Sequence, residues 1–180
     1  MRGGKRLALA VALAALVGLA LPAGGTLDMA AAANERPTRS GDLRQVNKVT
    51  ARYHSLRAAQ RDGFAAFSLD PNTPDVPTCF DSPDGGMGVH YVRHIDALLD
   101  ANDPEALVYE VGRNGQVKLV AVEYIVPEEF VDPDAPPMLF GEMLHHHPFL
   151  PVYILHAWIW KTNPDGLFAD FNPRVGACPT

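Results

Sequence analysis

Residues 117–126 (VKLVAVEYIV) constrain the fold more than any other stretch of the chain. Only Lys118 near the start and Glu123 near the end carry charge, and the two alternating faces are otherwise largely apolar. This pattern is typical of a strand inside a sheet that is covered on both sides. Burying a carboxylate in such a strand is costly unless a partner offsets its charge. The function of the domain therefore depends on which groups contact the Glu123 carboxylate.

The first 33 residues have the pattern of a secretory signal peptide. A basic segment, MRGGKR, precedes an Ala/Leu/Val run at 7–21, and the small residues at 31–33 fit a cleavage site, with a cut near Ala23 as an alternative. The run is shorter than the ~20 residues that a spanning helix needs, which favours cleavage over an uncleaved anchor. We therefore expect a signal peptide (1–33), a polar linker (34–41) and a single domain (42–180) that is secreted, periplasmic or at the cell surface, with no integral membrane segment.

The charge of the mature chain argues against a nucleic-acid partner. The full sequence has 15 basic and 21 acidic residues, and cleavage removes three basic residues and one acidic residue. The remaining 12 basic and 20 acidic side chains give a net charge of −8. Phosphate contacts need clusters of Lys and Arg, and the sequence has none.

The two cysteines, Cys79 and Cys178, predict a disulfide. Export exposes them to an oxidising compartment, where a disulfide is the default state of such a pair. A pair of thiolate metal ligands is the alternative that the sequence leaves open.

Apolar periodicity and turn residues predict the remaining elements. An amphipathic helix is expected over about 43–67 and a proline-rich loop over 69–88. The other expected elements are strands at 87–93, 106–111, 117–126 and 153–160, and a short helix at 138–144.

The second and third of these strands are expected to form a hairpin with a type I′ turn at Asn114-Gly115. This register places Glu110 and Glu123 on one face, roughly 13 Å apart at the usual strand rise. They are then too far apart for a close acid/base pair, and Glu110 is expected to be solvated. The predicted pairs are Glu110–Leu119, Val108–Ala121 and Ala106–Glu123.

Three ionisable residues, His90, Glu123 and His156, lie in the middle of predicted strands among apolar neighbours. If their strands are neighbours and the side chains share a face, they converge. Two imidazoles and one carboxylate are a ligand set for zinc or non-haem iron. The alternative is a purely structural role, in which Glu123 belongs to a hydrogen-bond network with Tyr and His side chains or pairs with a cation. The candidate cations are Arg93, Lys161 and Arg174.

Four further residues are weaker candidates for the same site. His145 and His147 belong to a run of three histidines that could supply another metal ligand from a loop, although such a run is often simply exposed. Tyr91 and Trp158 could line an aromatic ligand pocket, and core packing would explain them equally well.

Three stretches carry a resemblance to known proteins: GMGVHYV at 86–92, VAVEY at 120–124 and ADFNPR at 169–174. Residues 87–175 resemble the oil-body-associated protein family, a domain of unknown function, and more closely a group of uncharacterised exported bacterial proteins. The helix at 43–67 and the export signal depart from the plant pattern. The resemblance implies one unit with these strands in this order, and it implies no reaction.

Together these features predict an α+β fold, with an N-terminal amphipathic helix packed on a mainly antiparallel, curved sheet of four or more strands. The first functional hypothesis is an exported domain that binds a divalent metal such as Zn or Fe, or a small polar ligand, in a His/Glu/aromatic pocket. The second is an enzyme that uses the same residues in metal-assisted or acid–base chemistry. The third is a structural or partner-binding protein with a buried Glu/His network and no site.

Overall fold

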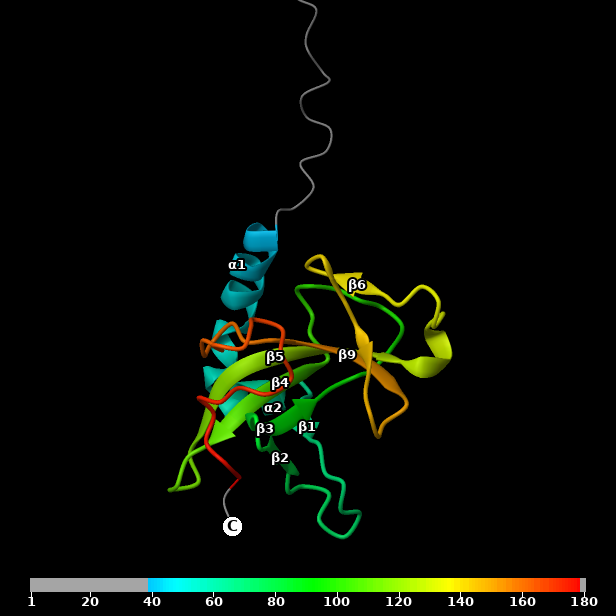
Figure 1. Ribbon diagram of the computed structural model, residues 1–180. Coiled ribbons are helices and arrows are strands. Elements are labelled where there is room, and N and C mark those ends of the chain that lie inside the picture. The colour runs from blue at the N-terminus through cyan, green and yellow to red at the C-terminus, as the bar shows by residue number, and fades with distance from the viewer. Residues whose placement is uncertain (1–38, 179–180) are drawn as a thin grey trace, which may run out of the picture. The chain divides into compact units, whose positions relative to one another are not determined.

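The computed structural model describes residues 39–178, which Figure 1 shows in colour. The predicted signal peptide (1–33) and residues 34–38 of the predicted linker lie outside the described residues. Residues 39–41, predicted as the end of the linker, already belong to the first helix.

An antiparallel sheet of seven strands dominates the described residues. The strand order is β1-β3-β4-β5-β9-β8, and β2 also pairs with β3. The predicted combination of helix with a mainly antiparallel sheet is confirmed. The strands of this sheet are β1 (Ala65–Ala66), β2 (Cys79–Ser82), β3 (Gly85–Val92), β4 (Ala106–Val111), β5 (Val117–Pro127), β8 (His145–His146) and β9 (Val152–Ala157).

The strand with the most constrained sequence, β5, lies between β4 and β9, and its residues 119–126 are buried. Val122 and Tyr124 belong to the core cluster that includes the helices. Ala121 and Ile125 point the other way because side chains alternate along a strand, and they belong to two separate clusters. The prediction that this strand is covered on both faces is confirmed.

Three helical segments cover one face of the sheet, and the predicted helix at 43–67 is too long. Buried Val46, Tyr53 and Ala59 point from these segments into the core. The Tyr109 hydroxyl donates to the Tyr53 carbonyl at 2.7 Å and ties the segments to β4. The segments are α1 (Arg39–Thr50), the 3₁₀ helix η1 (Ala51–His54) and α2 (Leu56–Arg61).

The helical region ends at Gly63, whose φ of 93° is left-handed. The Phe64 N–H donates to the Ala59 carbonyl and the Gly63 N–H to the Gln60 carbonyl, which is the hydrogen-bond pattern of a Schellman cap. Residues 65–66, predicted as helix, instead extend as β1 alongside β3.

The hairpin of β4 and β5 has the predicted register near Glu123 and a different one near the turn. Glu110 lies opposite Lys118 and not, as predicted, Leu119, because Val120 is an extra residue in β5. An extra residue of this kind is a β-bulge, and no residue pattern in β4 or β5 predicted it. The predicted pairs that are confirmed are Ala106–Glu123 and Val108–Ala121.

The turn of this hairpin has three residues, so the predicted type I′ turn is wrong. The Gly112 N–H donates to the Gln116 carbonyl at 2.7 Å. Gly115 has a φ of 73°, whereas Asn114 does not have a positive φ. A type I′ turn needs positive φ at both central residues, and a three-residue turn needs it only at the last.

The short helix predicted at 138–144 is also wrong, because these residues form the hairpin of β6 (Met138–Leu139) and β7 (Glu142–Met143). Its central residues, Phe140 and Gly141, have φ values of 55° and 77°. Left-handed backbone at two consecutive residues is incompatible with a right-handed helix and is typical of a type I′ turn.

The last strand of the sheet, β9, ends at Ala157, three residues before the predicted end. A strand that continued to residue 160 would have placed Trp160 on the same face as His156 and Trp158, and the structure does not. Trp158 packs on the face opposite the helices, whereas the Trp160 indole N–H donates to the Thr50 hydroxyl of α1.

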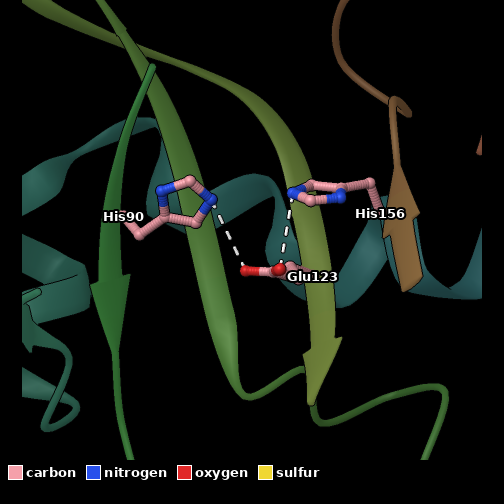
Figure 2. A group of neighbouring side chains, drawn as sticks. All are labelled: His90, Glu123 and His156. Atoms are coloured by element: carbon pink, nitrogen blue, oxygen red, sulfur yellow. Dashed lines mark ion pairs between the residues drawn. The ribbon is translucent and has the colours of Figure 1, made fainter. Parts of the chain in front are cut away.

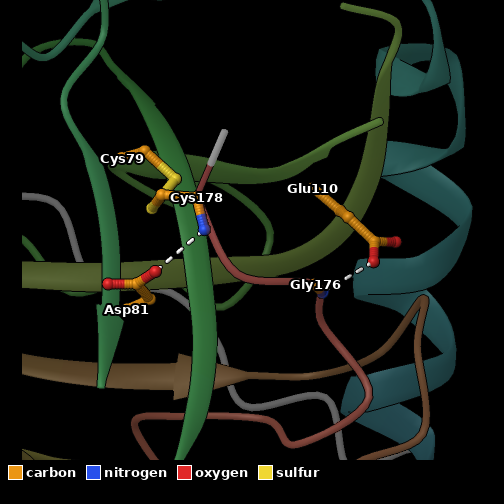
Figure 3. Close-up of a disulfide and its surroundings, with 5 residues drawn as sticks. All are labelled: Cys79, Asp81, Glu110, Gly176 and Cys178. Atoms are coloured by element: carbon orange, nitrogen blue, oxygen red, sulfur yellow. Dashed lines mark hydrogen bonds between the residues drawn. A yellow bond between two sulfur atoms is a disulfide. The ribbon is translucent and has the colours of Figure 1, made fainter. Parts of the chain in front are cut away.

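The C-terminal tail crosses the face of the sheet opposite the helices, where a disulfide and a hydrogen bond to Glu110 hold it (Figure 3). The predicted disulfide between Cys79 and Cys178 is present. Glu110, predicted to be solvated, is instead only 20% exposed, accepts the Gly176 N–H and pairs with the Lys161 ammonium at 2.7 Å. The tail thus gives Glu110 a structural role.

Candidate metal site

His90, Glu123 and His156 extend from β3, β5 and β9 toward one another, on the face opposite the helices (Figure 2). Glu123 lies directly opposite His156 in the pairing of β5 with β9. Strand β4 separates His90 from Glu123, and Ala106 is the β4 residue opposite Glu123. His90 lies opposite Val108 of the same strand, so the side chains of His90 and Glu123 meet across β4.

The three side chains form a tight, buried group. The His90 Nε2 lies 3.5 Å from the Glu123 Oε2, and the His156 Nε2 lies 3.4 Å from the Glu123 Oε1. One ligand atom of each residue lies within 4.8 Å of those of the other two. His90 and Glu123 are 5% exposed and His156 is fully buried. The convergence that the sequence predicted is present, and this cluster could hold a metal ion.

Three of the four imidazole nitrogens of this group have no hydrogen-bond partner. Among residues 39–178, five buried side-chain nitrogen and oxygen atoms have no hydrogen-bond partner. Three of these atoms are the His90 Nδ1 and both ring nitrogens of His156. The contacts of His90 and His156 with Glu123, at 3.5 and 3.4 Å, are longer than good hydrogen bonds. Since buried polar groups in proteins are nearly always paired, these nitrogens indicate a missing partner.

The electrostatics of the group favour a positive charge beside Glu123. Burial, together with the charges of His156 and His147, lowers the pKa of His90 to about 3, so this ring stays neutral. Burial raises the pKa of Glu123. Burial alone would lower the pKa of His156, but contact with Glu123 and Asp170 raises it overall. A proton on His156 or a bound cation can supply the charge.

Asp170, in the C-terminal tail, lies beside His156, and it was not among the site residues predicted from the sequence. Its Oδ1 lies 3.4 Å from the His156 Nδ1, and its Oδ2 lies 3.1 Å from the His145 Nε2. Burial would raise the pKa of Asp170, but the two histidines hold it well below its usual range. A carboxylate on the far nitrogen of a ligating histidine is a common feature of metal sites. The only sequence signal was its place in the ADFNPR stretch.

The two weaker histidine candidates do not join the ligand cluster. His145 contacts Asp170, which in turn contacts His156, so His145 is linked to the cluster through Asp170. The His147 Nδ1 accepts the backbone N–H groups of Phe149 and Leu150, at 3.1 and 3.0 Å. These bonds occupy the Nδ1 lone pair and place the ring proton on Nε2, so neither nitrogen of His147 is free to bind a metal.

The two aromatic candidates pack in the protein interior. Tyr91 lies on the helix-covered face, where its ring contacts Tyr109, because it alternates with His90 along β3. Trp158 stacks on His156 and its indole N–H donates to the Ala169 carbonyl. Neither lines the cavity described below.

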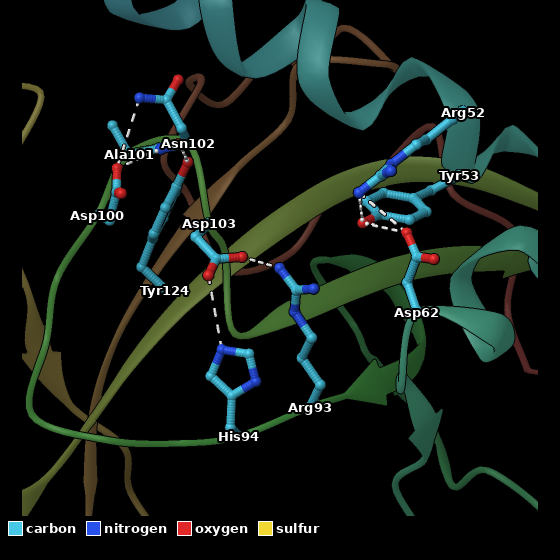
Figure 4. Close-up of polar contacts among 10 residues, drawn as sticks. All are labelled: Arg52, Tyr53, Asp62, Arg93, His94, Asp100, Ala101, Asn102, Asp103 and Tyr124. Atoms are coloured by element: carbon cyan, nitrogen blue, oxygen red, sulfur yellow. Dashed lines mark hydrogen bonds and ion pairs between the residues drawn. The ribbon is translucent and has the colours of Figure 1, made fainter.

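Two of the cations suggested as structural partners of Glu123 are paired elsewhere. Arg93 pairs with Asp103 (Figure 4) and also stacks over the Phe64 ring. Lys161 pairs with Glu110. The ion-pair contacts of Glu123 among the described residues are the two histidines.

A cavity of about 500 Å³ opens beside the cluster. His90 and Glu123 line it, whereas His156 lies behind them. A group bound at Glu123 would therefore remain accessible from the cavity. Most of the remaining wall is apolar and comes from several segments, among them Phe67, Phe80, Ile125, Ile154 and Phe171.

Comparisons with family models, with curated proteins and with solved structures find no match for this chain. The resemblance noted from the sequence motifs stays a prediction. Within the described residues, no helix is both long and apolar enough to cross a bilayer.

Proposed function

We propose that this protein is an exported metal-binding protein, in which the His90 Nε2, Glu123 and the His156 Nε2 hold one divalent cation. The observation that supports this most strongly is that one donor atom of each residue lies within 4.8 Å of those of the other two. The His90 Nε2 lies 3.5 Å from one Glu123 oxygen and the His156 Nε2 lies 3.4 Å from the other. Ligands about 2.1 Å from a tetrahedral metal lie about 3.4 Å from one another. The same spacing is too long for a good hydrogen bond.

The chemistry of the donor set also supports a transition metal. Imidazole and carboxylate ligands suit Zn²⁺ and Fe²⁺, and His90 is held neutral, as a ligand must be. A cation would give both buried histidines a partner and would offset the charge of Glu123. Asp170 would then accept the Nδ1 proton of His156 and fix the orientation of that ring. The Cys79–Cys178 disulfide is compatible with export.

Metal-assisted catalysis is the second candidate function, and the cavity favours it. Structural zinc sites are closed by four protein ligands, whereas catalytic sites keep a position open. Three protein ligands beside a cavity would leave such a position accessible to a ligand or substrate.

Zinc titration of the purified protein tests the proposal. The protein is prepared without a polyhistidine tag, with its disulfide intact, and is stripped of metal by chelator before calorimetry. We expect one Zn²⁺ per chain in the wild type and none at this site in Glu123→Gln. The matched control is His146→Ala, which removes an exposed histidine that contacts Glu128 and should leave the stoichiometry unchanged.

The opposing result is also well defined. If the wild type takes up no stoichiometric metal and the chelator leaves its melting temperature unchanged, the cluster is a structural network. Zinc that is lost in His146→Ala but kept in Glu123→Gln would place the binding at the exposed histidine run instead.

A further inference from the structure

The cavity beside the metal cluster has a mainly apolar wall that extends to the protein surface. Eight large apolar side chains are well exposed among residues 39–178, and three of them line this cavity. These are Leu69, Ile95 and Phe149, with exposed fractions of 54%, 41% and 89%. Apolar residues gathered at the rim of an apolar cavity are typical of a ligand site.

The polar side chains that line the cavity include two members of the metal cluster. His90 and Glu123 line the wall, and His147 lines it as well. Because the His147 Nδ1 accepts two backbone bonds, its Nε2 carries the ring proton and can only donate. A metal ion and an N–H donor both favour a ligand with an oxygen acceptor, and the metal favours an anion.

Two other carboxylates line the cavity, and both are engaged within the protein. Asp170 contacts His145 and His156, and the Asp81 Oδ2 accepts the Cys178 N–H at 2.8 Å. Without a metal, the carboxyl groups of the wall offer no positive charge to an anionic ligand. With a divalent cation in place, the charge of Glu123 is cancelled and one positive charge remains at the cluster.

We propose that the cavity binds an apolar organic acid, with its carboxylate on the metal held by His90, Glu123 and His156 and its hydrocarbon body against the apolar wall. This inference rests on the proposed metal site and adds the chemical class of its ligand. A volume of about 500 Å³ is within the range of small-molecule pockets. The anionic head explains the polar end of the cavity, and the apolar body explains the exposed rim.

Calorimetric titration with decanoate tests the inference on zinc-loaded and on chelator-stripped protein. We expect the zinc-loaded protein to bind decanoate at least tenfold more tightly than the stripped protein does. It should also bind decanoate at least tenfold more tightly than 1-decanol, which has the same body without the anionic head. From hexanoate to octanoate to decanoate, the affinity should rise about fourfold per methylene group that enters the cavity.

A matched pair of leucine variants tests the place of binding. Leu69 lines the cavity, whereas Leu98 is exposed and does not. Leu69→Asp should weaken decanoate binding at least tenfold with no change in zinc stoichiometry. Leu98→Asp should change neither value.

The outcomes separate the two proposals. If zinc binds with one-to-one stoichiometry but decanoate binds no better than acetate, the apolar-acid inference is wrong and the metal site stands. Equal binding of decanoate with and without zinc, or of decanoate and 1-decanol, overturns the placement of the head group on the metal. If zinc itself does not bind, the proposed function fails, and the ligand class fails with it.

Discussion

The two faces of the central sheet satisfy their buried polar groups in different ways. On the helix-covered face, the Tyr109 hydroxyl donates to the Tyr53 carbonyl, and the Tyr124 hydroxyl donates to the Ala101 carbonyl, both at 2.7 Å. Figure 4 shows the second of these bonds. On the opposite face, three imidazole nitrogens have no hydrogen-bond partner.

This difference separates stability from function. A buried group without a partner costs about 1–3 kcal/mol, so an unpaired cluster weakens the fold unless something binds it. The helix-covered face has the features of a folding core, and the opposite face those of a binding site. Substitutions on the two faces should therefore have separable effects, and the following experiments test that separation in order of expected size.

The largest effect is expected from Leu119→Ala on the helix-covered face. Leu119 is fully buried in that core, and truncation of such a leucine costs about 3–4 kcal/mol of unfolding free energy. Urea denaturation measures this loss. The zinc stoichiometry of the folded variant should remain one, and a loss of zinc binding by the folded variant would break the separation between the faces.

Glu123→Gln should have the opposite profile. In the metal-free state its unfolding free energy should stay close to that of the wild type, because the amide has the same shape and carries no charge to bury. Zinc at 100 times its dissociation constant should stabilise the wild type by about 2.7 kcal/mol and the variant not at all. Thermal melts with and without zinc measure both quantities. A large loss of unfolding free energy in the metal-free variant would instead assign Glu123 to the folding core.

Asp170→Asn tests how far the binding face extends. A neutral amide accepts the Nδ1 proton of His156 less strongly than a carboxylate does, so zinc affinity should fall by about 10–100-fold. The control is Asp165→Asn, an exposed residue of the same tail. An unchanged zinc affinity in Asp170→Asn would confine the site to the three strand residues.

Glu105 provides a contrast with Glu123, because it is a buried carboxyl that has a conventional partner. Its Oε2 accepts the Ile125 N–H at 3.0 Å, and burial raises its pKa from 4.5 to about 7. The folded protein therefore holds this proton between pH 4.5 and 7, whereas the unfolded chain releases it. The contribution of Glu105 to stability is greatest below pH 4.5 and falls as the pH rises through this window.

Glu105→Gln keeps a hydrogen-bond acceptor and removes the titration. Relative to the wild type, the variant should become more stable as the pH rises from 5 to 8, by roughly 1–2 kcal/mol. Denaturation at several pH values gives the difference between the two proteins. A difference that does not change with pH would mean that Glu105 is ionised in the folded state.

The parts of the structure that follow from local periodicity were predictable from the sequence. The alternation in residues 117–126 predicted a doubly covered strand, because side chains point to alternate sides of a strand. The convergence of His90, Glu123 and His156 was predicted only on the condition that their strands are close and the side chains share a face, and the structure meets this condition. Ala106 lies opposite Glu123 as predicted because the three-residue turn and the extra residue Val120 offset each other.

Features that depend on contacts between distant residues were not predictable. The bulge at Val120 leaves the apolar pattern intact, so the pairing of Glu110 could not be read from it. Phe140 gives no sign of a left-handed backbone. Asp170 lies in a tail without periodicity, and its role depends on how the tail folds back over the sheet.

An anomalous-difference map from zinc-soaked crystals, recorded at the zinc absorption edge, tests the central claim most directly. The account predicts one peak, about 2.0–2.2 Å from the His90 Nε2, a Glu123 oxygen and the His156 Nε2. A peak at the exposed histidines 145–147, or no peak near Glu123, would contradict it.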